Sequence, residues 1–255
     1  MTNAATLSGR TLAIDIGGTG IKMIALDGAG RPASKRQREL TPRPATPAAV
    51  FAVIRKMIDA QQAFERVSVG FPGVVVRGVV RTAPNLDDKA WRNVNLEEKI
   101  ARHTQKPTRV INDADLQGYG AIEGRGVELV LTLGTGLGGA LYIDGILVPN
   151  LELGHHPLRD GKTYEELVSD RQLKKIGKKR WRKRVAEVLA QVDLLFNCDL
   201  VHVGGGNAAR LATPLPPRVR VFDNVKGMTG GIRLWQRLPP GAPAARTVRG
   251  GVEPA

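Results

Sequence analysis

The chain of 255 residues carries 38 Lys and Arg against 24 Asp and Glu, a net charge of +14, and one cysteine, Cys198. Its composition, 42% hydrophobic and 24% charged, is typical of a folded globular protein. A single cysteine excludes an internal disulfide and a cysteine-based zinc cluster, so no zinc site is expected. No apolar run reaches the roughly 20 residues of a membrane span, and the first residues lack a signal-peptide core. We therefore expect a cytoplasmic protein.

The stretch between Leu12 and Gly28 predicts a glycine-rich β-hairpin near the start of the chain. Two short apolar runs flank a glycine cluster, and such a turn brings backbone N–H groups close to an anion because glycine has no Cβ. Asp15 precedes the turn, where a carboxylate can hold a magnesium ion or its water. An ordinary hairpin turn without a ligand is the alternative interpretation.

Hydrophobic periodicity predicts the elements that follow. We expect an exposed strand over 34–40, helices over 48–62, 96–103 and 115–124, and buried strands over 67–71 and 108–111. The region 74–91 is expected to form a strand followed by a loop.

The opening pattern is repeated 117 residues later. Thr132–Gly145 (TLGTGLGGALYIDG) aligns without a gap on Asp15–Gly28 (DIGGTGIKMIALDG), and the Asp-Gly pairs that end the two segments coincide. This repeat predicts two related lobes that face each other, with a phosphate chain between their glycine turns. The G-x-G-x-x-G match at Gly134 does not indicate a dinucleotide fold, because a strand-like segment follows it where that fold needs a helix. Gly161-Lys162-Thr163 is not a P-loop, because its first glycine is missing and no buried strand precedes it.

Asn112 and Asp113 follow a predicted buried strand and precede a predicted helix. A carboxylate in that position is well placed to accept the proton of a hydroxyl group. The alternative is that Asp113 only caps the helix, since aspartate is favoured there.

Glu152 and His155 place a carboxylate and an imidazole three residues apart. Together they suit a clamp on sugar hydroxyls, because glutamate accepts hydrogen bonds and histidine donates or accepts them. A metal site is disfavoured, because neither an H-E-x-x-H motif nor cysteines accompany them. A solvated loop remains the alternative.

The second half of the chain contains a strongly basic segment. We expect a helix starting at 164, a longer one over 181–196, a buried strand over 200–203 and a disordered tail from 239. Between Arg171 and Arg184 there are nine Lys and Arg residues and no acid. On one helix they would form like-charged rows at i,i+4, which a bound polyanion would relieve; the alternative is a solvated face. The candidate polyanion-binding residues are Lys174, Lys175, Lys178, Lys179, Arg180, Arg182 and Lys183.

Six stretches occur in the order found in one known family: DIGGTGIK (15–22), VGFPGVV (69–75), TAPNLDDKAW (82–91), INDAD (111–115), LVLTLGTGLGGALYIDGILVPNLELGH (129–155) and VGGG (203–206). With them the chain resembles ROK-family sugar kinases of the actin-like/hexokinase superfamily, most closely the bacterial polyphosphate glucokinase branch. The resemblance implies a two-lobed α/β actin-like ATPase (ribonuclease H-like) fold, with duplicated β-hairpin/helix lobes around a central cleft. We expect a small lobe over 1–112, a large lobe over 113–238, whose last helix returns to the first lobe, and a tail over 239–255.

The resemblance also implies roles for particular residues. Asp113 would be the catalytic base, and Mg²⁺ would be held indirectly by Asp15. The sugar would be bound by Asn85, Asn112, Asp113, Glu152, His155 and Glu165, the last chosen because it precedes Ser169 with the family's Glu-x-x-x-Ser spacing. Phosphate or nucleotide would be bound by Asp15, Gly17, Gly18, Thr19, Gly20, Lys22, Gly134, Thr135, Gly136, Gly204, Gly205 and Gly206.

The implied activity is phosphorylation of glucose at O6, with inorganic polyphosphate, ATP or both as donor and Asp113 ionised near the ordinary aspartate pKa of about 4. The basic segment favours polyphosphate. The chain looks shorter than the family between Gly206 and Asp223, which weakens the ATP assignment. Alternatives are an ATP-dependent kinase for mannose or glucosamine and a nucleic-acid-binding regulator, although specific nucleic-acid binding is not expected. The family suggests a homodimer.

Overall fold

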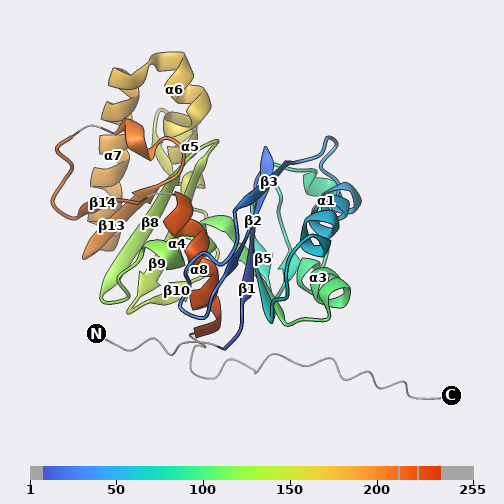
Figure 1. Ribbon diagram of the computed structural model, residues 1–255. Helices are drawn as coiled ribbons and strands as arrows, with labels where there is room; N and C mark the ends of the chain where they lie inside the picture. The colour runs from blue at the N-terminus through green and yellow to red at the C-terminus, as the bar shows by residue number, and fades with distance from the viewer. Residues whose placement is uncertain (1–7, 212, 223, 237–255) are drawn as a thin grey trace.

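The computed structural model describes residues 8–211, 213–222 and 224–236. They form two five-stranded sheets with a pair of helices between them and further helices on the outer face of each sheet (Figure 1). Among these residues, no helix is both long and apolar enough to cross a lipid bilayer. The tail expected over 239–255 lies outside the described residues.

The first sheet has the order β3-β2-β1-β4-β7. Its strands β1, β2 and β3 form an antiparallel meander, and β4 and β7 then add in parallel to β1. In chain order the elements are β1 (Thr11–Ile16), β2 (Gly20–Leu26), β3 (Gln37–Leu40), α1 (Pro47–Asp59), β4 (Arg66–Phe71), β5 (Val75–Val76), β6 (Val79–Val80), α2 (Asp88–Trp91), α3 (Leu96–Thr104) and β7 (Thr108–Asn112).

The second sheet has the equivalent order β10-β9-β8-β13-β14, with the same antiparallel and parallel pairings. The elements of this half are α4 (Asp113–Ala121), β8 (Val127–Leu133), β9 (Leu137–Ile143), β10 (Ile146–Val148), a 3-10 turn (Leu153–His155), β11 (Pro157–Arg159), β12 (Lys162–Thr163), α5 (Tyr164–Val168), α6 (Asp170–Ile176), α7 (Lys178–Phe196), β13 (Leu200–Gly204), a 3-10 turn (Ala208–Arg210), β14 (Val219–Val221) and α8 (Asn224–Gln236).

The sequence repeat is a structural repeat. Adding 117 to the bounds of β2 gives those of β9, as the gap-free alignment predicted. The core repeats in the same register, because side chains alternate between the two faces of a strand. Leu12 and Ile14 pack on the outer side of the first sheet, as Leu129 and Leu131 do in the second. The duplicated two-lobed α/β architecture is confirmed.

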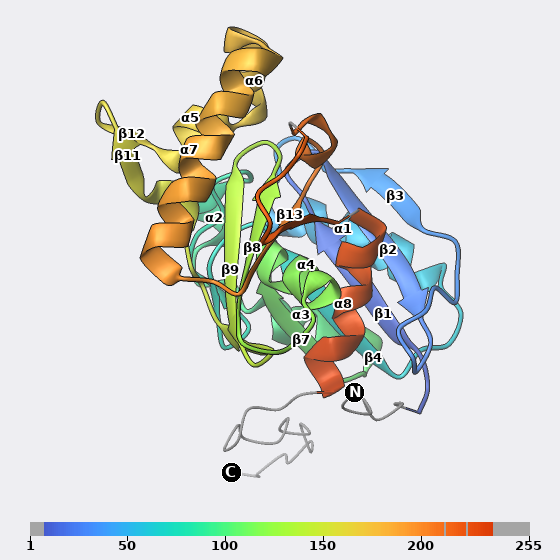
Figure 2. The ribbon, with the colours of Figure 1, turned by 90° about the vertical axis from the view of Figure 1, so that its left-hand side faces the viewer.

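Helices α4 and α8 lie side by side between the two sheets (Figure 2). A Cβ added at Gly230 of α8 would come within 2.1 Å of the carbonyl oxygen of Leu116 in α4, so the two backbones are nearly in contact. Helix α8 also packs on β1, where Met228 and Ile232 cover Ala13. The last described helix thus covers the inner face of the first sheet.

Three details differ from the sequence-based expectation. Helix α4 begins at Asp113 rather than Asp115, because the Asn112 side chain caps it. The loop expected to reach Trp91 ends in the short helix α2, which Asp87 caps. The basic segment is not one helix: α6 ends before Gly177, which has φ +77° and ψ 159°, and α7 starts after it. The two like-charged rows are therefore interrupted.

We expect Gly230→Ala to destabilise the protein. Alanine favours a helix by about 1 kcal/mol over glycine. However, the added Cβ meets a backbone carbonyl that cannot yield without moving α4, and such overpacking costs about 1–3 kcal/mol or more. Denaturant unfolding should show a net loss of about 2 kcal/mol.

Gly206→Ala is the matched control, because no atom lies within 4 Å of its added Cβ. Its unfolding free energy should change by less than about 0.5 kcal/mol. A Gly230→Ala protein as stable as the control would contradict the close packing of α4 and α8.

Candidate active site

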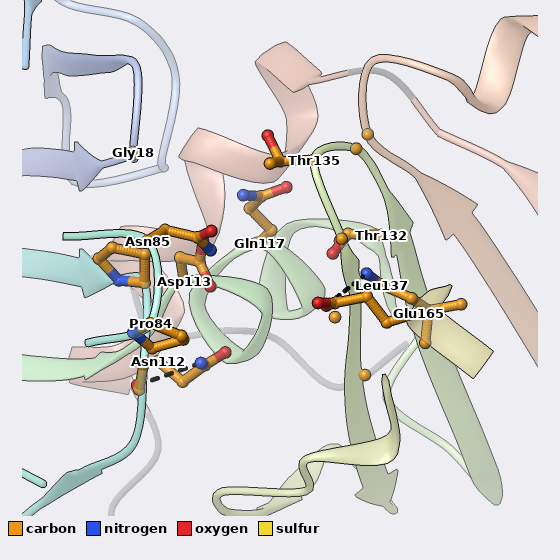
Figure 3. A pocket seen from close by; sticks show the side chains of 18 of the residues that line it. Gly18, Pro84, Asn85, Asn112, Asp113, Gln117, Thr132, Thr135, Leu137 and Glu165 are labelled. Atoms are coloured by element: carbon orange, nitrogen blue, oxygen red, sulfur yellow. Dashed lines mark hydrogen bonds between the residues drawn. The ribbon is translucent and has the colours of Figure 1, made fainter. Parts of the chain in front are cut away.

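A cavity of about 280 Å³ lies between the two lobes, where the turns of both hairpins meet the start of α4 (Figure 3). Asn85 and Asp113 lie on one wall, Leu137 and Glu165 lie on the other, and Gln117 points into the space between them. The sequence-predicted residues that line the cavity are Asp15, Gly17, Gly18, Thr19, Lys22, Asn85, Asn112, Asp113, Gly134, Thr135, Gly136, Glu152, His155, Glu165, Gly205 and Gly206.

The structure does not bring Gly20 and Gly204 to this cavity. Gly20 begins β2, and a Cβ there would meet the Arg38 guanidinium and the carbonyl of Glu39. Gly204 ends β13, and a Cβ there would lie 2.2 Å from the ring of Phe222. Both glycines permit close packing beside the site.

Each glycine turn is closed by a backbone hydrogen bond, to a residue three positions on in the first turn and two positions on in the second. The amide of Gly17 donates to the carbonyl of Gly20, and that of Gly134 to the carbonyl of Gly136, each at 3.0 Å. The first turn is fixed further by the Thr41 hydroxyl, which donates to the carbonyl of Gly17. Each lobe thus presents a rigid glycine turn to the cavity, where backbone amides can bind an anion without blocking side chains.

Asp15 forms an ion pair with Lys22 directly across the first hairpin. The two residues are cross-strand partners, and Nζ of Lys22 lies 2.7 Å from one carboxylate oxygen of Asp15. The pair places one carboxylate, 7% exposed, and one cation at the edge of the cavity.

Asn112, not Asp113, caps helix α4. Its Oδ1 accepts hydrogen bonds from the amides of Ala114 (2.8 Å) and Asp115 (3.2 Å), and its Nδ2 donates to the carbonyl of Gly73 (3.2 Å). Asp113 is therefore the first residue of the helix. One of its oxygens accepts the amide of Ala114, and the carboxyl group lines the cavity.

The electrostatics of Asp113 differ from the expectation of an ordinary ionised aspartate. Burial, reinforced by the charge of Asp15 and less strongly by Asp115 and Glu152, raises the pKa of Asp113 to about 8. The hydrogen bond from Ala114 offsets only part of this rise. With this pKa, most of the carboxyl group is protonated at pH 7.

Glu152 and His155 lie on the same 3-10 turn and face each other. Nε2 of His155 is 3.7 Å from a carboxylate oxygen of Glu152. Burial raises the pKa of Glu152; the charge of His155 opposes the rise and that of Glu165 adds to it. Glu152 and Glu165 thus form an acidic pair, and the charge of His155 offsets part of their repulsion.

Glu165 is held against the second glycine turn. Its Oε2 accepts the amide of Leu137 at 3.2 Å, and a Cβ on Gly136 would lie 2.1 Å from the same oxygen. Helix α5 is fixed in turn by a capping box between Thr163 and Glu166. A larger residue at 136 would thus displace the Glu165 carboxylate from this position.

Some lining residues were missed from the sequence. Gln117 follows Asp113 by four residues, one helical turn, and that spacing on a predicted helix was the signal that could have found it. Thr132, Gly73 and Pro84 also line the cavity, within stretches that carried the family resemblance.

The cavity suits Mg²⁺ bound mainly through a ligand. Among the described residues, no group of three or more His, Cys, Asp or Glu side chains could hold a metal ion. A single carboxylate, that of Asp15, is enough for such a site, because magnesium is commonly bound by one or two carboxylates together with waters and substrate phosphates.

Comparisons with known proteins agree with this geometry. The chain is 38% identical over 247 residues to polyphosphate glucokinase of Mycobacterium leprae, covering 90% of this chain and 75% of the relative. It is 37% identical over 249 residues to polyphosphate glucokinase of Mycobacterium tuberculosis, covering 90% and 92%.

A solved structure, the inorganic polyphosphate/ATP-glucomannokinase of Arthrobacter sp. strain KM, superposes with a TM-score of 0.78 at 34% identity, covering 88% of this chain and 97% of the other. The model of the ROK family matches residues 11–167, from the first hairpin to α5. The chain belongs to the ROK family and has its two-lobed, actin-like fold.

Proposed function

We propose that this protein transfers a phosphoryl group to the 6-hydroxyl of glucose, with inorganic polyphosphate, ATP or both as donor. The observation that carries the proposal is the convergence of two glycine turns and the Asp113 carboxyl group on one cavity. A cavity that combines glycine turns able to bind an anion with polar side chains able to hold sugar hydroxyls suits phosphoryl transfer to an alcohol. The polyphosphate glucokinases similar over nine-tenths of the chain support the same reaction.

In the proposed reaction, O6 of the sugar attacks the terminal phosphorus of the donor, and the bond from that phosphorus to its bridging oxygen breaks. Asp113 accepts the 6-hydroxyl proton, and the shortened donor leaves with the bond electrons. Glu152, His155, Glu165 and Asn85 hold the other hydroxyls. The amides of the two glycine turns stabilise the phosphoryl oxygens.

Asp15 would hold Mg²⁺ indirectly, and the ion would supply charge neutralisation at the transferring group. Lys22, paired with Asp15, holds that carboxylate in place and adds a positive charge at the edge of the cavity. These cations matter because Asp15, Asp113, Glu152 and Glu165 bring four carboxyl groups to a cavity that must accept a polyanion.

Mannose is a second candidate acceptor. The Arthrobacter relative is described as a glucomannokinase, so a closely related fold is associated with both sugars. The two hexoses share the 6-hydroxyl that faces the base in this proposal. Following the family resemblance, we also propose a homodimer acting in the cytoplasm, with sedimentation as the check on its mass.

A donor comparison tests the proposed activity. Purified protein with glucose should form glucose 6-phosphate with polyphosphate at matched free magnesium, and ATP and mannose are assayed in parallel. Activity with ATP and none with polyphosphate would overturn the assignment of polyphosphate as donor. No phosphorylation with either donor would overturn the kinase proposal.

Asp113→Asn should lower kcat by about a thousand-fold or more, because general-base catalysis contributes about 10²–10⁴-fold and the amide cannot accept the proton. Circular dichroism should show an intact fold. Asp160→Asn, in the exposed turn between β11 and β12, is the control and should keep normal turnover. Near-normal kcat in the Asp113 variant would refute the role of this residue.

The rate should depend on pH through the same group. Because the pKa of Asp113 is raised to about 8, the carboxyl group of the free enzyme is protonated below that pH and cannot act as base. Measured with the donor well below its KM, so that the enzyme without donor and cation is the reference state, the kcat/KM for glucose should therefore rise with pH, with unit slope, and level off above about pH 8. A profile flat from pH 6 to pH 9 would contradict this ionisation.

A further inference from the structure

The basic segment, residues 171–184, lies beside the mouth of the cavity. The amide of Asp170, the first residue of α6, donates to the carbonyl of Gly134 at 2.9 Å, and Asn207 Nδ2 donates to the Asp170 carboxylate at 3.4 Å. The start of α6 is therefore tied to the second glycine turn. Both ribbon views show α6 extending past the ends of β8 and β9 on that side of the molecule (Figures 1 and 2).

The buried face of the two helices orients the segment. Leu173 of α6 and Trp181 and Val185 of α7 are buried in the core of the second lobe. The indole N–H of Trp181 donates to the carbonyl of Val168 at 2.7 Å, which fixes the first turns of α7. The cations are thus displayed on faces whose directions follow from the helical repeat.

Arg182 of α7 contacts the 3-10 turn Ala208–Arg210, which follows the glycines that line the cavity. The Arg182 guanidinium donates to the carbonyls of Arg210 (2.7 Å) and Leu211 (2.9 Å). Lys178 lies one helical turn before Arg182 on the same face of α7. Lys174 pairs with Asp170 at 2.6 Å, next to Asn207.

The other lysines face elsewhere. Lys175 lies two residues after buried Leu173, and Lys179 and Lys183 lie two residues before and after buried Trp181. Two residues correspond to about 200° around a helix, so all three point away from the core. These three lysines carry the same charge as the cations near the 3-10 turn and belong to the same segment, but their side chains are directed away from the core.

We propose that Lys174, Lys178 and Arg210, with Arg182 holding the 3-10 turn, form a track along which a polyphosphate donor leaves the cavity past Gly206. This inference rests on the proposed function and adds the surface path that the polyphosphate donor follows outside the cavity. A cavity of about 280 Å³ holds a hexose and the terminal phosphoryl groups, so the rest of a long chain must lie on the surface outside. Lys174, Lys178 and Arg210 are exposed there.

The track suits polyphosphate better than a nucleic acid. Proteins that bind single-stranded nucleic acid combine cations with aromatic side chains on which bases stack. The one aromatic residue of the basic segment, Trp181, is fully buried with its N–H bonded to the backbone. The exposed groups of the segment therefore offer charge to phosphates and no platform for bases.

Three triple variants test the track. The first removes the track cations, Lys174→Gln, Lys178→Gln and Arg210→Gln. The second removes equal charge from the outward face, Lys175→Gln, Lys179→Gln and Lys183→Gln. The third, Arg55→Gln, Lys56→Gln and Lys89→Gln, removes exposed cations of α1 and α2 on the other lobe. Each is assayed with glucose and with tripolyphosphate or long-chain polyphosphate as donor.

We expect the track variant to raise the KM for long-chain polyphosphate about ten-fold, because three exposed ion contacts are lost. Its KM for tripolyphosphate should rise by less than about two-fold, since a short donor lies within the cavity. The outward-face variant should change the long-chain KM less than the track variant, and the α1/α2 variant should match the unmodified protein.

Salt dependence supplies a second measure. The slope of log KM for long-chain polyphosphate against log salt concentration should fall by about two units in the track variant, because each phosphate contact releases counterions. Equal effects of the track and outward-face variants, on KM or slope, would show diffuse attraction and overturn the track. An unchanged KM for long-chain polyphosphate in the track variant would also overturn the track.

Direct binding separates this inference from the proposed function. Fluorescence anisotropy of end-labelled polyphosphate should show weaker binding to the track variant than to the outward-face variant, with or without glucose. If long-chain polyphosphate, tripolyphosphate and ATP all give no glucose 6-phosphate but this binding difference persists, the kinase proposal fails and the track stands. A single-stranded oligonucleotide of equal charge that binds more tightly than polyphosphate would overturn the choice of partner.

Discussion

The close contact between α4 and α8 fixes the spacing of the two sheets, and the cavity depends on that spacing. Gly230 allows the backbones to meet at Leu116, and α4 carries Asn112, Asp113 and Gln117 at its cavity end. A larger residue at 230 would push α4 toward the second lobe and move the base relative to both glycine turns. The geometry of the site is therefore set partly by a helix contact that faces away from it.

The second constraint is electrostatic. Four carboxyl groups border a cavity suited to phosphates, and the charges of two of them, Asp15 and Glu152, add to burial in raising the pKa of Asp113. A bound cation near Asp15 would lower that pKa, because it favours the ionised form of a neighbouring carboxyl group. Binding of the donor with its cation and activation of the base are thus physically coupled in the proposed mechanism.

Local patterns in the sequence predicted much of the fold. The repeat between 15–28 and 132–145 predicted both lobes. Alternating apolar residues and glycine turns are local patterns, so a few neighbouring residues are enough to recognise them. The raised pKa of Asp113 was not predictable, since it depends on burial between the two lobes and on the charge of Asp15, which lies almost a hundred residues earlier. The break at Gly177 was missed because one glycine costs a helix only about 1 kcal/mol and its positive φ leaves no trace in the sequence.

The return of α8 to the first sheet also bears on how the protein is made. On the ribosome, β1, β2 and β4 emerge long before α8, so Ala13, Ile24 and Leu26 have no covering helix until residue 236 has left the exit tunnel. The hydroxyl of Ser68 donates a hydrogen bond to the carbonyl of Gly231 and accepts one from the indole N–H of Trp235. Both partners belong to α8, so these bonds also form only once this helix is in place. The first sheet is therefore completed only after the second lobe has been made, when the last helix packs on it.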